Sequence, residues 1–385
     1  MKNSNPSIAI IGGGIAGLTT AIALRKLGFR PVIFESAPEI KALGAGLVLA
    51  ANAIKALERI GIAEKVIPAG HLLDTFSILD QNGRPITVAD SQVMSDRYGL
   101  NNFAIHRSEL QRILLQASGD LDIITGKKAV GIKQHEDYTT LYFQDGTEYD
   151  AEVVLVADGI HSAIRQQLAP NSQPRYAGYT CWRAVIKNPG IELLGTSETW
   201  ASAGRFGIVP LKHQQIYWFL CINAPQNDAT MRAVTVEDLV ARFKDIHAPI
   251  PQILQATRNE QLIHNDIIDL KPIKQFAYGR VLLLGDAAHA TTPNMGQGAC
   301  QAIEDAAVLL DQWEKMPGVL PVEIFQAFEH RRLKRTHSIV NRSWSLGKIA
   351  QWSNPLAITL RNGLFRRIPA SVNERQLAEV YRVDF

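Results

Sequence analysis

The sequence has too few cysteines, spaced too widely, for a disulfide-stabilised or zinc-binding protein. Its 385 residues include three, Cys181, Cys221 and Cys300, and none belongs to a CxxC motif. This pattern argues against a disulfide framework and a cysteine zinc site, and it fits a reducing compartment. His161 and His289 are also isolated from other metal-ligating residues. We therefore expect no metal site.

The sequence also lacks a long apolar run and a strong charge of either sign. No stretch approaches the ~20 apolar residues of a membrane-spanning helix. Residues 1–6 precede the first expected strand, and its apolar run, Ile8–Ile11, is too short for a signal peptide. A formal net charge of +3 on 385 residues does not indicate a nucleic-acid partner. We expect a soluble, cytoplasmic protein with no nucleic-acid partner and no integral membrane segment.

A glycine-rich turn near the N-terminus lies between the apolar strand Ile8–Ile11 and an expected helix over residues 15–27. Gly12 permits the tight turn, Gly14 lets backbone N–H groups approach a pyrophosphate, and Gly17 lets the helix pack closely on the strand. The helix N-terminus then offers free N–H donors and partial positive charge to the phosphates. This arrangement predicts that the turn binds a dinucleotide.

An acidic residue follows the next expected strand, over residues 31–34. At the end of that strand, Glu35 can accept hydrogen bonds from an adenosine ribose diol. The carboxylate argues against a 2′-phosphate, and hence against NADP, at this site. The turn and the acid do not separate FAD from NAD, because both carry the same ADP half.

A second strand–turn–helix motif distinguishes the two dinucleotides. Asp286 ends the apolar strand over residues 280–284, and residues 293–298, rich in glycine, open a long helix over 299–314. NAD needs one phosphate-binding turn. FAD extends far enough to need an acceptor for its ribityl hydroxyls and a positive helix dipole at the edge of its ring system. The second motif therefore favours FAD.

Two basic residues near these motifs each have two interpretations. Lys41 is either a phosphate contact or a solvated lysine. Arg107 stands before an expected helix over 108–118, with Ser108 as its N-cap. It could bind a diphosphate bidentately or remain a surface arginine.

A third motif follows the apolar strand expected over residues 152–157. Asp158 is placed at the ligand side of a parallel sheet, directly before Gly159. Because Asp158, Ser162 and Arg165 fall at helical spacing, local helix capping explains them equally well.

Between these motifs the sequence changes to alternating strands. Asn82–Gly83 joins two short segments and is a strong hairpin signal. From about 176 to 276 the alternation, with frequent Tyr and Trp, suits an antiparallel sheet with one buried face. That face is either a pocket wall or plain core, and Trp182, Arg183 and Trp218 fit the core better.

The C-terminal part is expected to be helical. Charged residues between 329 and 335 suggest a solvated face on a helix over 321–341. Farther on, Arg361, Arg366 and Arg367 stand near apolar residues in a helix that either docks on the body or touches a membrane or partner.

Taken together, three motifs resemble those of the single-component FAD-dependent aromatic hydroxylases, the p-hydroxybenzoate hydroxylase fold family. The likeness is greatest to the branch of salicylate, 3-hydroxybenzoate and urate hydroxylases, and it covers about residues 6–345. The motifs are Gly12-x-Gly14-x-x-Gly17, Asp158-Gly159 with Ser162 and Arg165, and Gly285-Asp286 with Pro293 and Gly296-Gln-Gly298.

The resemblance implies an α/β fold with a discontinuous Rossmann-like FAD-binding domain, a β-rich substrate domain and C-terminal helices. A chain of 385 residues is long enough for two cores. The expected ranges are 1–72, 98–172 and 277–340 for FAD, 73–97 and 173–276 for substrate, and 341–385 for the C-terminal helical segment.

The resemblance also assigns roles to residues. Asp286 matches a ribityl ligand, Arg107 matches an arginine on the FAD diphosphate, and residues 293–298 lie alongside the flavin ring. The segment 158–165 serves both FAD and a passing nicotinamide cofactor. The expected cofactor-binding set is Gly12, Gly14, Ile15, Ala16, Gly17, Glu35, Lys41, Gly46, Arg107, Val130, Asp158, Asp286, Gly296, Gly298 and Ala299.

On the substrate side, Arg205 and Tyr217 lie on successive expected strands and resemble a pair that contacts substrate in the urate-type branch. Together with Pro293 beside the flavin ring, they are the candidate catalytic residues. Arg205 could bind a carboxylate or polarise an oxyanion, and Tyr217 could orient or deprotonate a phenol. Both could instead simply complete the sheet.

The implied activity is that of a monooxygenase. NAD(P)H reduces FAD, O2 reacts to a flavin C4a-hydroperoxide, and one oxygen atom enters an aromatic or heteroaromatic small molecule. NAD(P)H is expected to bind transiently, and the enzyme to be a monomer or homodimer. The alternatives are a non-phenolic substrate (an isoprenoid epoxidase or a tetracycline-inactivating enzyme) and a non-oxygenating flavoprotein reductase or binding protein.

Overall fold

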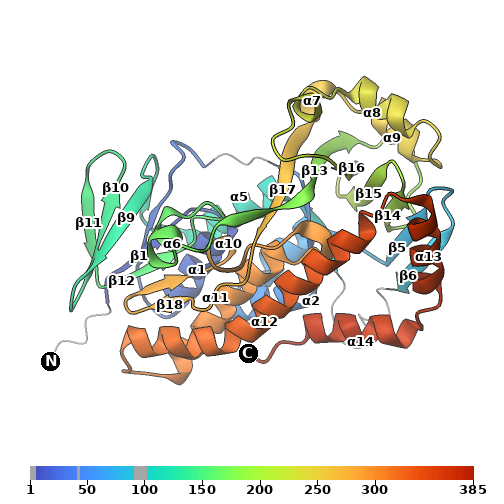
Figure 1. The fold of residues 1–385 in the computed structure, drawn as a ribbon. Coiled ribbons are helices and arrows are strands. Elements are labelled where there is room, and N and C mark those ends of the chain that lie inside the picture. Colours follow the sequence, from blue (N-terminus) through green and yellow to red (C-terminus); the bar gives the residue numbers. More distant parts are fainter. Residues whose placement is uncertain (1–5, 41–43, 91–101) are drawn as a thin grey trace.

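The computed structural model describes residues 6–40, 44–90 and 102–385 (Figure 1). Its first layer is a six-stranded sheet in the order β18–β19–β12–β1–β2–β8. All neighbours pair in parallel except β18 with β19. The strands are β1 (Ile8–Ile11), β2 (Val32–Phe34), β8 (Ile123–Ile124), β12 (Val153–Val156), β18 (Ala277–Tyr278) and β19 (Val281–Leu283).

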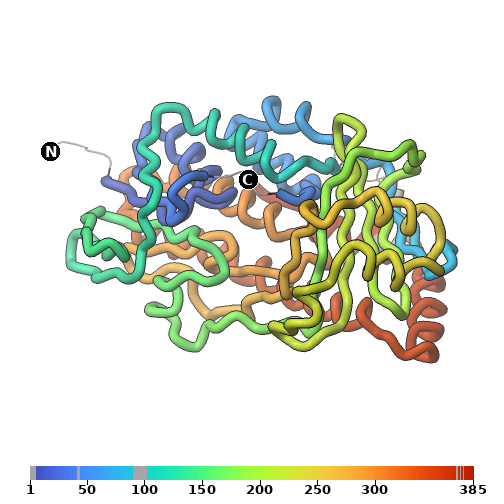
Figure 2. The backbone as a smooth tube through the Cα atoms, turned by 90° about the horizontal axis from the view of Figure 1, so that it is seen from above, coloured from blue at the N-terminus to red at the C-terminus, as the bar shows by residue number. Residues whose placement is uncertain are grey.

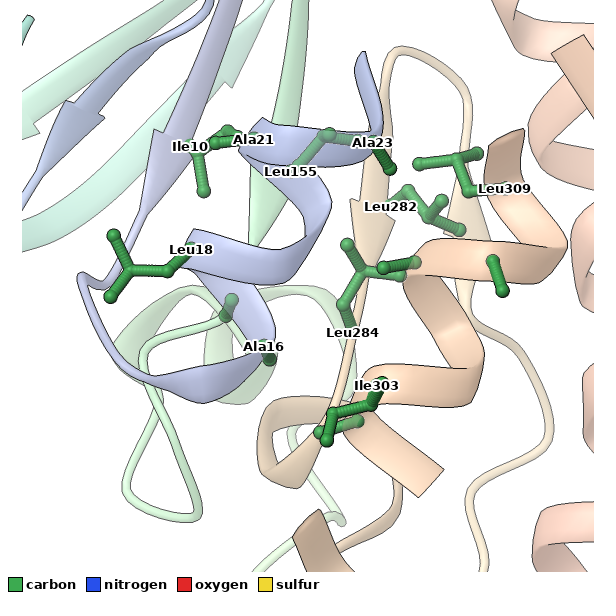
Figure 3. Close-up of a cluster of buried hydrophobic side chains, with 14 of the residues drawn as sticks. Ile10, Ala16, Leu18, Ala21, Ala23, Leu155, Leu282, Leu284, Ile303 and Leu309 are labelled. Atoms are coloured by element: carbon green, nitrogen blue, oxygen red, sulfur yellow. The ribbon is translucent and has the colours of Figure 1, made fainter. Parts of the chain in front are cut away.

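Both faces of this sheet are covered, which explains why β1 and β12 are uninterrupted apolar runs. Helices α1 (Ile15–Lys26), α5 (Arg107–Ser118) and α11 (Gly298–Lys315) pack together on one side. Figure 3 shows apolar side chains of α1, α11 and the strands meeting there. On the other side, Phe34 contacts Phe143 and Tyr149 of a three-stranded sheet. That sheet consists of β9 (Ala129–Gln134), β10 (Thr139–Phe143) and β11 (Glu148–Ala151).

The second layer is a seven-stranded sheet in the order β17–β13–β16–β15–β14–β5–β6, antiparallel except where β14 meets β5. Helices α8 (Val236–Phe243) and α9 (Ile250–Gln255) belong to its core, which includes Trp182 and Trp218. The strands are β5 (Thr75–Asp80), β6 (Pro85–Asp90), β13 (Pro174–Lys187), β14 (Thr196–Ala201), β15 (Gly204–Leu211), β16 (Gln215–Asn223) and β17 (Ile263–Leu270).

Short elements connect the two layers. A small sheet has the order β3–β7–β4, with β3 (Gly46–Leu49), β4 (His71–Leu72) and β7 (Phe103–His106). The remaining short helices are α2 (Ala51–Ile60), α3 (Ala63–Val66), α6 (Ala163–Leu168), α7 (Ala229–Arg232) and α10 (Asp286–His289), with 3₁₀ turns η1 (Ile67–Ala69), η2 (Asn259–Gln261) and η3 (Pro293–Met295).

Three helices end the chain: α12 (Pro321–Ala350), α13 (Pro355–Arg366) and α14 (Ala370–Tyr381). Helix α12 crosses the front of the molecule in Figure 1, packing on α11 at one end. Helix α13 packs on β6 of the seven-stranded sheet. Figure 2 shows this sheet at one end of the molecule and the three-stranded sheet at the opposite end. Helix α13 is docked on the body, although Leu356, Leu360 and Leu364 remain exposed on it.

Two local predictions were wrong. The N-cap of α5 is His106, whose ring nitrogen accepts a hydrogen bond from the backbone N–H of Ser108. The solvated face expected on α12 was wrong at Arg332, which is only 1% exposed and binds acidic residues of α11, whereas His330 and Lys334 of the same segment are exposed. In both cases the helix itself was predicted. The errors concern a hydrogen bond or ion pair that a side chain makes.

Candidate active site

A cavity of about 420 Å³ lies where the six-stranded sheet, the small sheet and the seven-stranded sheet meet. One end is formed by the start of α1 and by the α10–α11 segment, and the other end by β13, β15 and β16. Twelve of the predicted residues line it: Gly14, Ile15, Ala16, Gly46, Arg107, Asp286, Gly296, Gly298, Ala299, Pro293, Arg205 and Tyr217. The topology therefore brings both predicted ends of the site into one space.

The three glycines of the turn have different surroundings. A Cβ atom on Gly17 would lie 1.9 Å from the Gly12 carbonyl oxygen, and one on Gly12 would lie 2.4 Å from the Ala157 oxygen. Gly12 also has a φ of +104°, which L side chains rarely adopt. A Cβ on Gly14, by contrast, would meet no protein atom within 4 Å. Gly12 and Gly17 are thus needed for close packing, whereas Gly14 borders free volume at the helix N-terminus.

Glu35 is held firmly behind this turn, outside the cavity lining. Its Oε2 accepts a hydrogen bond from the Gly13 N–H at 2.7 Å, and its Oε1 accepts one from the Ala37 N–H at 2.8 Å. The carboxylate is therefore fixed at the end of β2, beside the start of α1. This is the place where the sequence predicted a ribose ligand.

The segment after β12 contains one buried polar atom that the fold does not satisfy. Within the described chain, Asp158 Oδ1 is buried without a hydrogen-bond partner. Burial raises the pKa of this carboxyl to about 6, with Ser162 opposing the shift. Ser162 caps α6 through the Arg165 N–H at 3.0 Å. The Arg165 guanidinium donates to the Ile160 carbonyl at 2.6 Å. Ser162 thus caps the helix, Arg165 also reaches the Ala287 carbonyl at 3.4 Å, and Asp158 retains capacity for a ligand.

Asp286 and Arg107 bring opposite charges to the cavity. Asp286 follows β19 and is exposed toward this space. The surrounding protein nevertheless raises the pKa of its carboxyl, while His289 and Arg107 oppose the shift. Arg107 begins α5, and its backbone N–H donates to the Ala45 carbonyl at 3.0 Å.

A buried ion network fixes the turn that carries Asp286. Asp305 on α11 accepts hydrogen bonds from the Gly285 N–H at 2.8 Å, from His289 Nε2 at 2.8 Å and from Arg332 Nε at 2.7 Å. Arg332 also pairs with Glu304. His289 therefore holds the turn together through Asp305, and the position of Asp286 depends on helices α11 and α12.

Arg205 at the opposite end is buried and fully engaged with protein groups. Its Nη1 donates to Glu198 at 2.9 Å, its Nη2 to Asn294 at 2.8 Å, and its Nε to Gln351 at 2.8 Å. The guanidinium also lies 5.3 Å from the ring centre of Tyr179. Because Glu198 already offsets its charge, Arg205 joins β15 to the Pro293–Met295 turn and α12 rather than presenting a free cation.

Tyr217 lies against the small sheet. A Cβ on Gly46 would be 2.5 Å from its ring, so glycine is needed there for β3 to approach. Burial raises the pKa of the Tyr217 hydroxyl well above its usual value, although Arg183 opposes the shift. The hydroxyl is therefore neutral at physiological pH and can donate a hydrogen bond.

Sequence reasoning placed Arg183 in the core, but it lines the cavity. Within the described chain, no carboxylate lies within ion-pair distance of it. Strand alternation is the signal that could have found it, because Trp182 and Trp218 point into the core while Arg183 faces the opposite side. The other lining residues that were missed include Cys181, Cys221, Phe219, Val209, Glu198 and Asn294.

One predicted cofactor residue of the described chain lies away from the cavity. Val130 lies on β9 of the three-stranded sheet and is 45% exposed. Lys41 lies outside the described residues. Four further predicted residues do not line the cavity itself. They lie in or beside the glycine turn: Gly12, Gly17, Glu35 and Asp158.

These features fit a bound FAD. A helix N-terminus with open space at Gly14, an unsatisfied buried oxygen on Asp158 and a cavity-facing carboxylate on Asp286 provide partners for phosphate and hydroxyl groups. The fold and the site together define an FAD-dependent oxidoreductase.

The chain belongs to the FAD-binding-domain family, whose model matches residues 6–343. It is 38% identical over 361 residues to the aurachin C monooxygenase/isomerase of Stigmatella aurantiaca, covering 94% of each chain. It is 32% identical over 376 residues to the 2-heptyl-3-hydroxy-4(1H)-quinolone synthase of Pseudomonas aeruginosa, covering 96% of each. Among solved structures, Klebsiella pneumoniae HpxO complexed with FAD and uric acid matches with a TM-score of 0.89 and 26% identity, over 97% of this chain and 96% of that one.

These findings confirm the predicted family, the α/β fold, FAD as cofactor and the activity class. The protein is an FAD-dependent monooxygenase of the aromatic hydroxylase type, and it acts on a small molecule. No helix in the described ranges is both long and apolar enough to cross a bilayer.

Proposed function

We propose that this monooxygenase hydroxylates a fused heteroaromatic ring that carries an enolisable oxygen, of the 4(1H)-quinolone class, with NAD(P)H and O2 as co-substrates. The product named for the Pseudomonas aeruginosa relative carries a hydroxyl at C3, beside the oxygen-bearing C4. The relative named for aurachin C has the higher identity of the two.

The observation that carries this proposal is Arg183, a cation that faces the cavity without a carboxylate of the described chain to neutralise it. Beside it lie Cys181 and Tyr217, and the same cavity wall includes the apolar side chains of Phe219 and Val209. A buried cation needs a counter-charge, and the C4 oxygen of the deprotonated quinolone, the enolate, would provide one. The cation favours this enolate, whose neighbouring ring carbon is electron-rich, as oxygen insertion requires.

Other residues have supporting roles in this proposal. Tyr217 donates a hydrogen bond and orients the ring. Phe219 and Val209 exclude water from the reacting end. Arg205 holds the Pro293–Met295 turn against the sheet.

We propose further that FAD is held by the predicted set around Gly14, Arg107, Asp158, Asp286 and the N-terminus of α11. When bound, FAD supplies electron transfer from NAD(P)H and activation of O2. We also propose the domain ranges given above; the six-stranded and seven-stranded sheets, which carry opposite ends of the cavity, support a division into an FAD-binding and a substrate domain.

The test is a substrate panel with the purified holoenzyme. NADH and NADPH oxidation would be followed with 2-heptyl-4(1H)-quinolone, uric acid, salicylate and 3-amino-4-hydroxybenzoate, and products would be analysed by mass spectrometry. We expect the quinolone to stimulate oxidation and to gain one oxygen atom. Stimulation by uric acid or a benzoate, with an inert quinolone, would overturn the substrate assignment.

Variants of Arg183 test its role directly. We expect Arg183→Met to raise KM for the quinolone at least tenfold with FAD retained, and Arg183→Lys to retain part of the affinity. Lys187→Met is the matched control, because Lys187 is an exposed residue at the end of the same strand. Equal effects of Arg183→Met and Lys187→Met would remove Arg183 from the site.

A further inference from the structure

Two of the three cysteines are direct neighbours across adjacent strands. In the register of β13 and β16, Cys181 pairs with Cys221. The same register continues to Ala224, whose N–H donates to the Gly178 carbonyl, and to Asn188, whose N–H donates to the Gln214 carbonyl. Pairs with even numbers on β13 therefore exchange backbone hydrogen bonds. The Cys181–Cys221 pair is of the non-hydrogen-bonded kind, in which Cα atoms lie about 4.5 Å apart.

That separation falls inside the range of about 4.4–6.8 Å found between the Cα atoms of disulfide-bonded cysteines. Both side chains also point to the same face of the sheet, and both line the cavity. Next to them in the same row stands Arg205, which pairs with Cys221 in the β15–β16 register. The third cysteine, Cys300, lies on α11 and is free as well.

The surroundings favour reaction at one of the two sulfurs. Burial alone would raise the pKa of the Cys181 thiol. A hydrogen bond from Cys221 and the positive charges of Arg183 and Arg205 outweigh it and bring the pKa below its usual value. The pKa of Cys221 is raised, because it retains the shared proton and is buried. A thiol with a lowered pKa beside a second thiol is the arrangement that forms a disulfide in two steps.

We propose that Cys181 and Cys221 form an oxidisable dithiol in the wall of the substrate cavity, which hydrogen peroxide converts into a cross-strand disulfide. The Cys181 thiolate attacks one peroxide oxygen, giving a sulfenic acid and, with one proton, water. The Cys221 sulfur then attacks the Cys181 sulfur, and the sulfenic hydroxyl leaves as a second water. Two thiols are oxidised by two electrons and one peroxide is reduced.

The disulfide changes the substrate end of the cavity. It joins β13 to β16 beside Arg205 and Arg183 and removes the two sulfhydryl groups that face them. We therefore expect oxidation to lower substrate-stimulated NAD(P)H oxidation reversibly while FAD stays bound. Hydrogen peroxide is the two-electron reduction product of O2, so an O2-consuming enzyme is itself a local source. This source of peroxide rests on the proposed function. The dithiol itself does not, because the test below uses added peroxide.

The test is peptide mapping of the holoenzyme after treatment with hydrogen peroxide. Remaining thiols are blocked with N-ethylmaleimide under denaturing conditions before digestion with trypsin. The sequence places Cys181 in peptide 176–183, Cys221 in peptide 213–232 and Cys300 in peptide 281–315. We expect the first two peptides to appear joined, with a mass equal to their sum less two hydrogens, and to separate with dithiothreitol. Peptide 281–315 should remain blocked and unjoined.

Variants distinguish the dithiol from general oxidation. Cys300→Ser should leave the joined peptides unchanged. In Cys221→Ser no disulfide can form, so Cys181 should remain a sulfenic acid that dimedone traps, and peptides 176–183 and 213–232 should not be joined. The proposal is overturned if wild-type peptides 176–183 and 213–232 both stay blocked, or if Cys181 becomes a sulfinic acid without joining. An inactive quinolone panel with joined peptides would instead affect only the proposed function.

Discussion

Two glycines only three residues apart have different neighbours, and this difference predicts different phenotypes. Gly17→Ala places a Cβ atom 1.9 Å from the Gly12 carbonyl, so either α1 or the turn must shift. We expect a loss of about 3 kcal/mol in the free energy of unfolding. Gly14→Ala meets no protein atom within 4 Å. It should cost about 1 kcal/mol or less, as alanine replaces glycine at an N-cap.

The measurement is thermal or urea unfolding together with flavin absorbance after gel filtration. Gly14→Ala should fold but lose FAD, because its methyl group occupies space at the helix N-terminus that we assign to the pyrophosphate. If Gly14→Ala keeps wild-type FAD affinity, the phosphates do not bind there.

The buried pair of Arg205 and Glu198 gives a second prediction at this scale. Arg205→Met leaves the Glu198 carboxylate buried with its ion-pair partner gone, which should cost about 3–5 kcal/mol in unfolding free energy. The double variant Arg205→Met, Glu198→Gln should recover part of this loss. A urea double-mutant cycle measures the coupling.

A surface pair provides the comparison for this cycle. Arg258 and Glu260 form an ion pair in which both side chains are about 70% exposed. Arg258→Met should therefore change the unfolding free energy by less than about 1 kcal/mol. Additive effects of Arg205→Met and Glu198→Gln would mean that the buried charges do not depend on each other.

At the scale of elements, ion pairs join α11 and α12: Arg332 of α12 binds the carboxylates of Glu304 and Asp305 on α11 and lowers their pKa values. Burial alone would raise the pKa values of Glu304 and Asp305, but Arg332 and neighbouring groups bring both below their usual values of 4.5 and 3.8. Carboxylates with a lowered pKa in the folded state stabilise the protein above those values. This stabilisation is lost as pH falls through 4.5 and 3.8 toward the folded-state values.

We therefore expect the unfolding free energy of the wild type to decline progressively below about pH 4.5. In Arg332→Met the two carboxylates lose their buried cation, so the variant should be several kcal/mol less stable at pH 7. Its decline on acidification should be shallower, because protonation now relieves carboxylate charges that Arg335 and His289 leave only partly paired. Urea unfolding between pH 3.5 and 7 measures both slopes, and parallel slopes would contradict the role of Arg332.

The same helices illustrate which features sequence alone could predict. Helix α12 was expected from its start at Pro321, because periodicity is local. The burial of Arg332 was missed, because its partners Glu304 and Asp305 lie on α11, 28 and 27 residues away in sequence. The place of Arg183 was missed for a related reason. Alternate residues of a strand face opposite sides of the sheet, and which side faces a cavity depends on what packs against the other side.

At the scale of the molecule, the motifs correctly predicted an FAD-dependent monooxygenase, because each glycine turn places a helix N-terminus where it can bind part of a dinucleotide. The two motifs at the α1 end of the cavity follow β1 and β19, which lie more than 100 residues apart, and their meeting follows from the parallel order β19–β12–β1–β2. What the sequence did not indicate is how the substrate end is closed, because that involves contacts of the C-terminal helices.

Those helices connect the two layers. On α13, Phe365 lies 5.5 Å from the ring centre of Trp200 in the seven-stranded sheet, and Arg361 lies 4.8 Å from the same indole. On α14, the Tyr381 hydroxyl accepts a hydrogen bond from Asn102 at 2.9 Å, and Tyr381 belongs to the core of the FAD-binding layer. One continuous segment thus contacts both layers.

Removal of residues 353–385 should therefore weaken the connection between the layers more than it weakens FAD binding, because the glycine turn and Asp286 do not depend on this segment. We expect a lower Tm, flavin retained at moderate temperature, and an unfolding transition that separates into two steps. Phe365→Ala should reproduce part of the loss, about 1–3 kcal/mol, whereas Leu360→Ala, at a side chain 61% exposed, should cost less than about 0.5 kcal/mol. Calorimetry of the three variants measures the number of transitions and the loss of stability.

Two outcomes would contradict this prediction. A single transition at the wild-type Tm after truncation would show that α12 alone holds the two sheets together. Equal losses for Phe365→Ala and Leu360→Ala would show that the exposed face of α13 is covered in solution.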